Sequence, residues 1–137
     1  MRLIAALLLS ASAHAAEWRA VDVEVTAYCP CAEVCCGKGA SGTTADGTNT
    51  ATTPFGVALS RSAERQIPLG SVLWIPLGEG YLDESRATDR AFLADDRTHR
   101  KTVATLSDRP LIDLRYRTHH SAALFGRKLM TVFVWVE

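Results

Sequence analysis

The residues with the greatest chemical potential are four cysteines within eight positions, in the stretch CPCAEVCC that begins at Cys29. They are Cys29, Cys31, Cys35 and Cys36, and the chain contains no others. Such a cluster could form two disulfides, hold a metal ion or supply a reactive thiol. It lacks the second C-x-x-C pair that zinc ribbons carry about a dozen or more residues away. The choice therefore depends on the redox state of the compartment.

The N-terminus predicts export. Met1 and Arg2 precede the apolar run LIAALLL, and small residues lead to the exit Ala13-His14-Ala15. This order is typical of a secretory signal peptide over residues 1–15, although a buried N-terminal helix is the alternative. The run is shorter than the ~20 apolar residues that cross a bilayer. We therefore expect a protein in the periplasm or outside the cell, without a membrane anchor.

An oxidising compartment favours disulfides over a metal site in the cysteine cluster. Adjacent cysteines rarely bond to each other because the linkage is strained. Two pairings remain, Cys29–Cys36 with Cys31–Cys35 or Cys29–Cys35 with Cys31–Cys36, and either would staple the loop after the first strand. A metal site, which we do not favour, would require the fold to return a distant histidine to the cysteines. The candidates are His99, His119 and His120.

Composition indicates one globular domain over residues 16–137. Hydrophobic residues make up 47% of the chain, which is enough for a core. Fifteen basic and fifteen acidic residues balance, so charge gives no case for binding nucleic acid or an acidic membrane. The chain has no P-loop, G-x-S-x-G or H-E-x-x-H motif, which argues against the common nucleotide-binding and hydrolase classes.

The elements that must position any site are mostly β-strands. Residues 21–28 alternate with period two, as expected of a half-buried strand that leads into the cysteines. Compact apolar runs predict further strands at 56–59, 72–75, 91–94, 102–106, 111–114 and 130–136. A helix is predicted at 121–125 before Gly126, and an insertion loop at 82–90. Short, closely spaced strands favour a compact barrel.

The order of motifs resembles the 3D-domain family, small exported double-psi β-barrels named for three aspartates. The matching pieces are VTAYCPC, CCG, GTTADG, GVALS, IPLGSVLWIP, LADDRT, LIDLRY and HHSAALFGRKLMTVFVW. They cover most of the chain from Val25 to Glu137 in the family's order. The resemblance implies a mainly β fold, a six-stranded double-psi β-barrel with one short helix and a long insertion loop.

The resemblance also implies a relation to peptidoglycan lytic transglycosylases, and in barrel architecture to expansins. Lytic transglycosylases cut glycan strands between N-acetylmuramic acid and N-acetylglucosamine without water, and leave a 1,6-anhydro ring. One carboxyl must protonate the leaving oxygen and then help to deprotonate the sugar's 6-hydroxyl. Such an acid needs a partly desolvated position that raises its pKa, while a second carboxylate can stabilise the oxocarbenium-like state. We expect no cofactor.

Asp113 is the predicted acid and base. It interrupts the apolar strand LIDLRY, and the matching aspartate of the family is credited with catalysis. An exposed carboxylate on an amphipathic strand, or a cap of the turn after Pro110, is the alternative. The second aspartate is Asp96, with an inserted loop, or Asp108, with a shortened one; Asp96 has the better local match through Arg97.

The third family aspartate is absent, because Ser60 stands at or near its place in VALSR. A hydroxyl can donate a hydrogen bond to a sugar but cannot supply negative charge. Thr43, Thr44 and Asp46 match the segment that lines the family's cleft, so these three and Ser60 are the predicted substrate-binding residues. The alternative for GTTADG is a flexible turn.

The aromatic residues have different expected places. Trp74 and Trp135 lie on apolar strands and are predicted to be in the core, whereas Trp18 and Tyr81 could stack on sugar faces. The two histidines before the predicted helix are expected at its surface or cap rather than as ligands.

Two functional classes follow. The first is a monomeric lytic enzyme that acts on the glycan strands of peptidoglycan. The second is a non-catalytic, expansin-like module that binds cell-wall glycan in the same cleft, which the loss of the aspartate at Ser60 favours. Action on another polysaccharide is a third possibility.

Overall fold

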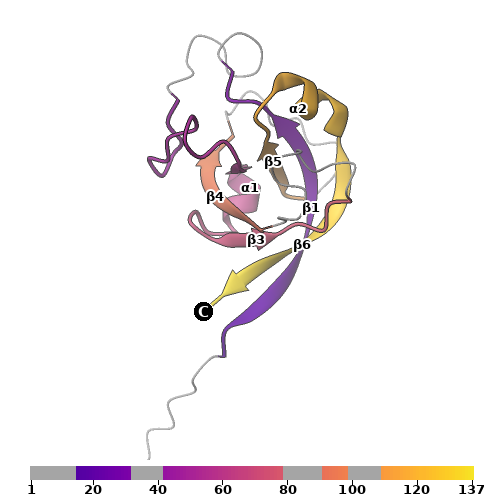
Figure 1. Cartoon of the computed structure of the whole chain (residues 1–137). Coiled ribbons are helices and arrows are strands. Elements are labelled where there is room, and N and C mark those ends of the chain that lie inside the picture. Colours follow the sequence, from indigo (N-terminus) through magenta and orange to yellow (C-terminus); the bar gives the residue numbers. More distant parts are fainter. Residues whose placement is uncertain (1–14, 32–41, 79–90, 99–108) are drawn as a thin grey trace, which may run out of the picture.

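Six strands close into one barrel in the order β1-β5-β2-β4-β3-β6 (Figure 1). The computed structural model describes residues 15–31, 42–78, 91–98 and 109–137. The strands are β1 (Glu17–Tyr28), β2 (Gly56–Leu59), β3 (Val72–Trp74), β4 (Ala91–Arg97), β5 (Leu111–Arg115) and β6 (Lys128–Val136). The pairs β1–β5 and β2–β4 are parallel and the other four pairs are antiparallel, so the barrel is mixed.

The predicted mainly β fold with a closed six-stranded barrel is confirmed, and its strands lie where the apolar runs placed them. The segment 56–59 matches β2 at both ends, whereas β1 and β4 are longer than predicted. The predicted strand at 102–106 and the insertion loop at 82–90 lie outside the described residues. Residues 1–14 of the predicted signal peptide do so too.

The barrel interior is built from alternate residues of each strand. On β1 the inward residues are Val21, Val23 and Val25, all buried. Val25 pairs with Ile112 of β5, which in turn pairs with Leu59 of β2, so these three form one layer of the core. Each such buried aliphatic side chain contributes roughly 1.5–3 kcal/mol. The side chains between them project from the outer face of the barrel.

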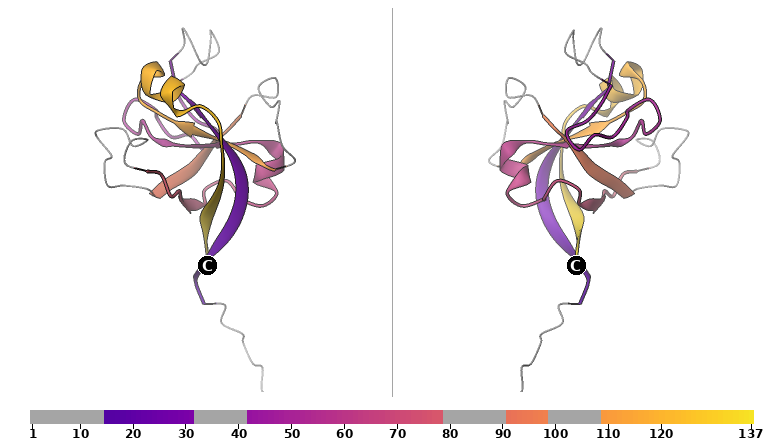
Figure 2. Two further views of the ribbon diagram at one scale, coloured as in Figure 1. Left: turned by 90° about the vertical axis from the view of Figure 1, so that its right-hand side faces the viewer. Right: turned by 90° about the vertical axis from the view of Figure 1, so that its left-hand side faces the viewer.

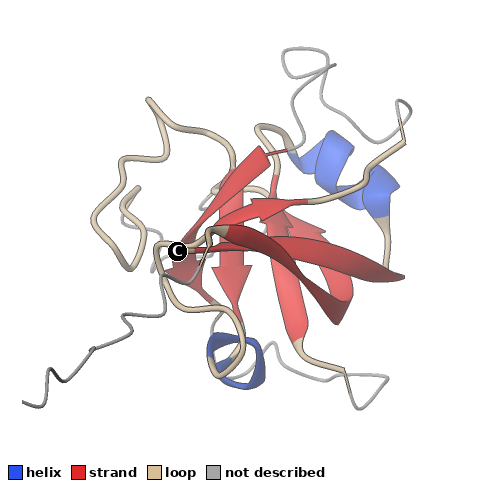
Figure 3. Cartoon of the chain, turned by 90° about the horizontal axis from the view of Figure 1, so that it is seen from below, coloured by secondary structure: helices blue, strands red, loops and turns tan. Residues whose placement is uncertain are grey.

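Two helices lie at separate places around the barrel (Figure 3). The predicted helix is α2 (His119–Phe125), which begins after Thr118 and ends at Gly126, whose φ of 70° suits a residue without a Cβ. The second, α1 (Arg61–Glu64), is a single turn that was not predicted. No helix among the described residues has the length and hydrophobicity needed to cross a membrane.

The strands β1 and β6 extend past the rest of the barrel as an antiparallel ribbon that ends at the C-terminus (Figure 2). Trp18 pairs with Trp135 on this ribbon, and their ring centroids are 5.1 Å apart.

The prediction that Trp74 and Trp135 belong to the core is wrong, because their side chains are 39% and 36% exposed. The inward positions of β6 are Val132 and Val134, so Trp135 must face outward. Trp18, Trp74 and Phe133 line an open hollow of about 400 Å³ on this outer face.

Candidate active site on the outer face of the barrel

Strand register brings the two best sequence candidates onto one row. Thr26 of β1 pairs with Asp113 of β5, Asp113 pairs with Ala58 of β2, and Ala58 pairs with Asp96 of β4. Directly paired residues project from the same face of a sheet. Asp113 therefore points outward, since its neighbours along β5 point into the core.

Ala58 separates the two carboxylates. With strands about 4.8 Å apart, the backbones of Asp113 and Asp96 lie about 10 Å from each other across β2. The row therefore holds two acidic groups on either side of a small, buried residue.

Asp113 is suited to hold a proton at mildly acidic pH. Burial raises the pKa of its carboxyl to about 6, and the negative charge of Asp96 acts in the same direction. The Thr26 hydroxyl, which donates to Asp113 Oδ1 at 3.0 Å, and the positive charge of Arg127 oppose this pKa shift in part. A carboxyl with this pKa can both give and take a proton at mildly acidic pH.

Asp96 is held differently. Its carboxylate accepts hydrogen bonds from the Tyr28 hydroxyl at 3.1 Å and from the backbone N–H groups of Ala45 at 3.0 Å and Arg97 at 2.9 Å. Burial raises the pKa of Tyr28, so the phenol keeps the proton that it donates. A carboxylate that only accepts hydrogen bonds behaves as a fixed negative charge, which suits the role of an electrostatic stabiliser.

A buried ion pair lies beside this row. Asp95 and Arg115 are both fully buried and form two parallel hydrogen bonds of 2.8 and 2.6 Å. A register shift between Val57 and Ala58 inserts Asp95 as an extra residue in β4, so it faces the same way as Asp96. The pair passes over Gly56, where a Cβ atom would lie 2.5 Å from Arg115 Nη2 and 2.6 Å from Asp95 Oδ1.

Arg115 also fixes the segment that enters β2. Its guanidinium donates to the carbonyl oxygens of Thr53 at 3.2 Å, Pro54 at 3.3 Å and Phe55 at 3.0 Å. A fully buried guanidinium with this many acceptors has little freedom to move. The ion pair is therefore a structural support beside the candidate active site, and no motif or periodicity in the sequence predicts it.

The segment GTTADG reaches the site from the other side. The backbone N–H of Asp46 donates to the Asp95 carbonyl oxygen at 3.1 Å, next to the contact between Ala45 and Asp96. The Asp46 carboxylate accepts hydrogen bonds from Thr48 and Thr44, which lower its pKa. Thr44 is buried in this turn, whereas Thr43 and Asp46 are exposed. The predicted cleft segment therefore does border Asp96.

Ser60 and Asp108 are not part of this row as described. Ser60 is fully buried, and its hydroxyl accepts a hydrogen bond from the Ala63 N–H as the cap of α1. The structure thus gives Ser60 a capping role away from solvent. Asp108 lies outside the described residues, so Asp96 alone of the two alternatives is placed relative to Asp113.

The cysteine cluster contains a disulfide that neither expected pairing includes. Cys29 is bonded to Cys31, with their Cα atoms 5.3 Å apart, so both predicted pairings are wrong. This pairing was excluded from the sequence because it would leave the adjacent Cys35 and Cys36 to bond to each other, yet the Cα atoms of Cys29 and Cys31 lie within ordinary disulfide range. Cys35 and Cys36 lie outside the described residues.

Comparison with known proteins adds no relative to this picture. No protein-family model matches the chain, and no curated protein is significantly similar to it. The function therefore has to be inferred from the chain's own residues and their geometry. In the fold, strand pairing and one backbone hydrogen bond bring Thr26, Asp113 and Asp96 together with the segment that contains Ala45.

Proposed function

We propose that the protein is an exported lytic transglycosylase of the 3D-domain type that acts on the glycan strands of peptidoglycan. The observation that carries this proposal is the half-buried Asp113, with a pKa of about 6, across Ala58 from the hydrogen-bonded carboxylate of Asp96. In the same proposal the mixed barrel, with two parallel strand pairs, is a double-psi barrel.

The meeting of distant motifs supports this proposal. Four pieces of the sequence resemblance, VTAYCPC, GTTADG, LADDRT and LIDLRY, are far apart in the chain. Tyr28, Ala45, Asp96 and Asp113 come from these four pieces and are linked by hydrogen bonds or strand pairing. If these four pieces matched the family by chance, there would be no reason for them to meet around the same two carboxyl groups.

The reaction needs two proton transfers and no water. Protonated Asp113 gives its proton to the glycosidic oxygen as the bond from that oxygen to C1 of N-acetylmuramic acid breaks. The fixed charge of Asp96 stabilises the positive charge that develops at C1. The sugar's 6-hydroxyl then attacks C1, and Asp113 takes the proton that this hydroxyl loses. The products are a 1,6-anhydro end and a free 4-hydroxyl, and Asp113 is protonated again.

The proposal is tested with purified peptidoglycan sacculi and mass spectrometry of the soluble products. We expect muropeptides with 1,6-anhydro ends from the native protein and none from an Asp113→Asn variant. Asp22→Asn is the matched control, because Asp22 lies on the exposed part of β1 and accepts a hydrogen bond from Thr131. Hydrolysed reducing ends in place of anhydro ends would contradict the transglycosylase mechanism.

A glycan-binding module without catalysis is the second candidate. It is favoured by Ser60, which replaces the third family carboxylate and is committed to capping α1. The same experiment separates the two functions. A protein that sediments with sacculi but releases no soluble muropeptide would be a binding module.

A further inference from the structure

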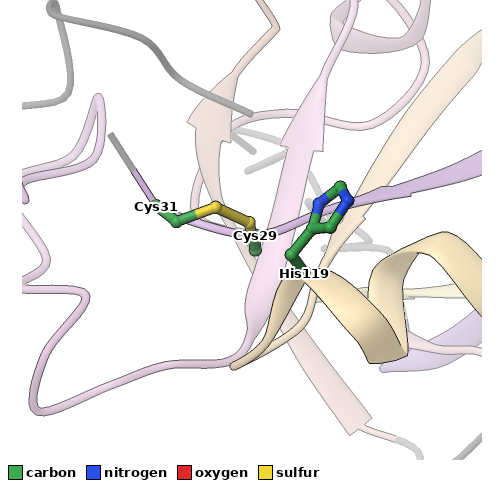
Figure 4. A group of neighbouring side chains, drawn as sticks. All are labelled: Cys29, Cys31 and His119. Atoms are coloured by element: carbon green, nitrogen blue, oxygen red, sulfur yellow. A yellow bond between two sulfur atoms is a disulfide. The ribbon is translucent and has the colours of Figure 1, made fainter. Parts of the chain in front are cut away.

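The disulfide lies beside a histidine that is distant in sequence. The two sulfur atoms and a ring nitrogen of His119 all lie within 4.8 Å of one another. Cys29 and Cys31 follow the end of β1, and His119 begins α2 (Figure 4). Cys29 is buried, Cys31 is half-buried and His119 is exposed, so the cluster lies at the surface and an ion could reach it.

We propose that reduction of the Cys29–Cys31 disulfide creates a binding site for a thiophilic metal ion, with Zn²⁺ as its natural occupant. The ligands are the two thiolates and the imidazole of His119. Two sulfur donors and one nitrogen donor suit zinc, and a tetrahedral site spaces such ligand atoms about 3.5–3.8 Å apart. The observed cluster is compact enough to reach this geometry with small side-chain movements.

Electrons and protons balance when the disulfide is converted into a metal site. A dithiol reductant supplies two electrons and two protons, the sulfur–sulfur bond breaks, and the dithiol is itself oxidised to a disulfide. The metal ion then displaces the two thiol protons as it binds. A small-molecule disulfide reverses the sequence: the ion leaves, the Cys29–Cys31 bond forms again, and the oxidant is reduced to two thiols. The site is therefore either a disulfide or a metal centre, but never both.

The metal would join the end of β1, which borders the candidate active site, to the start of α2. Tyr28, which donates to Asp96, directly precedes Cys29, and the N–H of Tyr116 donates to the Tyr28 carbonyl oxygen at 2.8 Å. A bound ion would connect this end of β1 to the first residue of α2 through a ligand bond. This inference does not depend on the proposed glycan cleavage.

The test measures Zn²⁺ binding to the full chain by native mass spectrometry and titration calorimetry, before and after reduction. A phosphine reductant is used because it avoids competing thiols. We expect one Zn²⁺ per reduced chain and none per oxidised chain. Equal binding in both states, or none in either, would overturn the proposal.

Variants of the histidines and of the other two cysteines test whether Zn²⁺ binds at this site or only to cysteine thiols in general. His119→Ala should weaken Zn²⁺ binding about tenfold or more, whereas His120→Ala, the neighbouring exposed histidine of α2, should leave it unchanged. The double variant C35S/C36S should retain binding. If His119→Ala binds as tightly as the native chain, or if C35S/C36S loses the ion, the assignment of ligands is wrong.

A cobalt titration gives a readout that a merely destabilised variant would not change. Co²⁺ bound by two thiolates and an imidazole should show sulfur-to-cobalt charge transfer together with visible bands of a tetrahedral ion. Cys31→Ser is the preferred ligand variant, because Cys31 is less buried than Cys29 and its replacement should disturb packing less. It should lose about half of the charge-transfer intensity, and full intensity would contradict the proposal.

Discussion

Two charged pairs lie next to each other on the outer face of β4 and β5, but they differ in burial and in the sign of their charges. Asp95 and Arg115 are fully buried and neutralise each other through two short hydrogen bonds. Asp113 and Asp96 carry the same sign, stand on opposite sides of Ala58 and are half-buried. The first pair fixes the segment that enters β2, whereas the second leaves a carboxyl group with a raised pKa. Proximity of charge alone therefore does not mark function, whereas a carboxyl group whose pKa is raised by burial is a better indication.

The largest expected effect is on catalysis by the like-charged pair. Asp113→Asn should lower the rate of 1,6-anhydro product formation by about 10²–10⁴-fold, because the amide cannot donate or accept the transferred proton. Turnover is measured on sacculi under identical conditions for the variant and for Asp22→Asn. Activity within twofold of the native value would show that Asp113 is not the acid.

The next effect is on the stability of the oppositely charged pair. Arg115→Met should reduce the free energy of unfolding by about 3–5 kcal/mol, because it leaves the buried Asp95 carboxylate without a partner. Denaturant unfolding measures this loss.

Two further variants sharpen the same comparison. Asp95→Asn combined with Arg115→Met should be less damaging than Arg115→Met alone, since no unpaired charge remains. Arg97→Ala, which breaks the exposed pair with Glu64, should cause no measurable change. A loss in Arg97→Ala equal to that in Arg115→Met would contradict the contrast between buried and exposed pairs.

The burial of Asp113 should also make the free energy of unfolding depend on pH, in the direction opposite to that of most carboxylates. The pKa of Asp113 is about 6 in the folded protein and 3.8 without the fold's influence, so the folded state binds this proton more tightly. The stabilisation is complete below pH 4 and is lost as the pH rises through 6. Asp113→Asn, which has no charge to bury, should therefore exceed the native protein in stability by about 2–3 kcal/mol at pH 7.5. The difference should vanish near pH 4; a constant difference would exclude titration as its cause.

The smallest effect concerns the hydrogen bond within the row. Thr26→Val removes the hydroxyl that donates to Asp113 and holds its pKa down. The pKa of Asp113 should then rise further, and the fall in activity on the alkaline side should move to higher pH. A pH–rate profile checks this, and a shift to lower pH would show that the Thr26 hydroxyl does not hold the pKa of Asp113 down.

The sequence predicted the strands well where burial alone defines them. The run at 56–59 is apolar and buried throughout, and both its ends were placed correctly. The first residues of β1 are exposed, and Glu17 to Ala20 form strand because they pair with β6 rather than because they bury a face. Pairing with a distant strand leaves no periodic signal in the chain.

Only part of the candidate site could be predicted from the sequence, for a related reason. Asp113 stands out because it interrupts an apolar strand, but its neighbour Asp96 could be chosen over other aspartates only through motif resemblance. Asp95 enters the face through a β-bulge, and its partner Arg115 is set by register. The approach of His119 to Cys29 likewise depends on where α2 begins in space. Such contacts are fixed by tertiary packing, which short-range patterns do not contain.

The ribbon of β1 and β6 determines where a label or a solid support can be attached to the protein. Glu17 pairs with Val136, so the first and last strands end side by side. From Trp18 to Tyr28 the strand advances by about 33 Å, at about 3.3 Å per residue. A fluorophore, affinity tag or solid support joined to Glu137 would thus stand well away from Asp113 and Asp96. A protein immobilised through Glu137 would therefore leave the row of Thr26, Asp113 and Asp96 accessible to a large insoluble polymer.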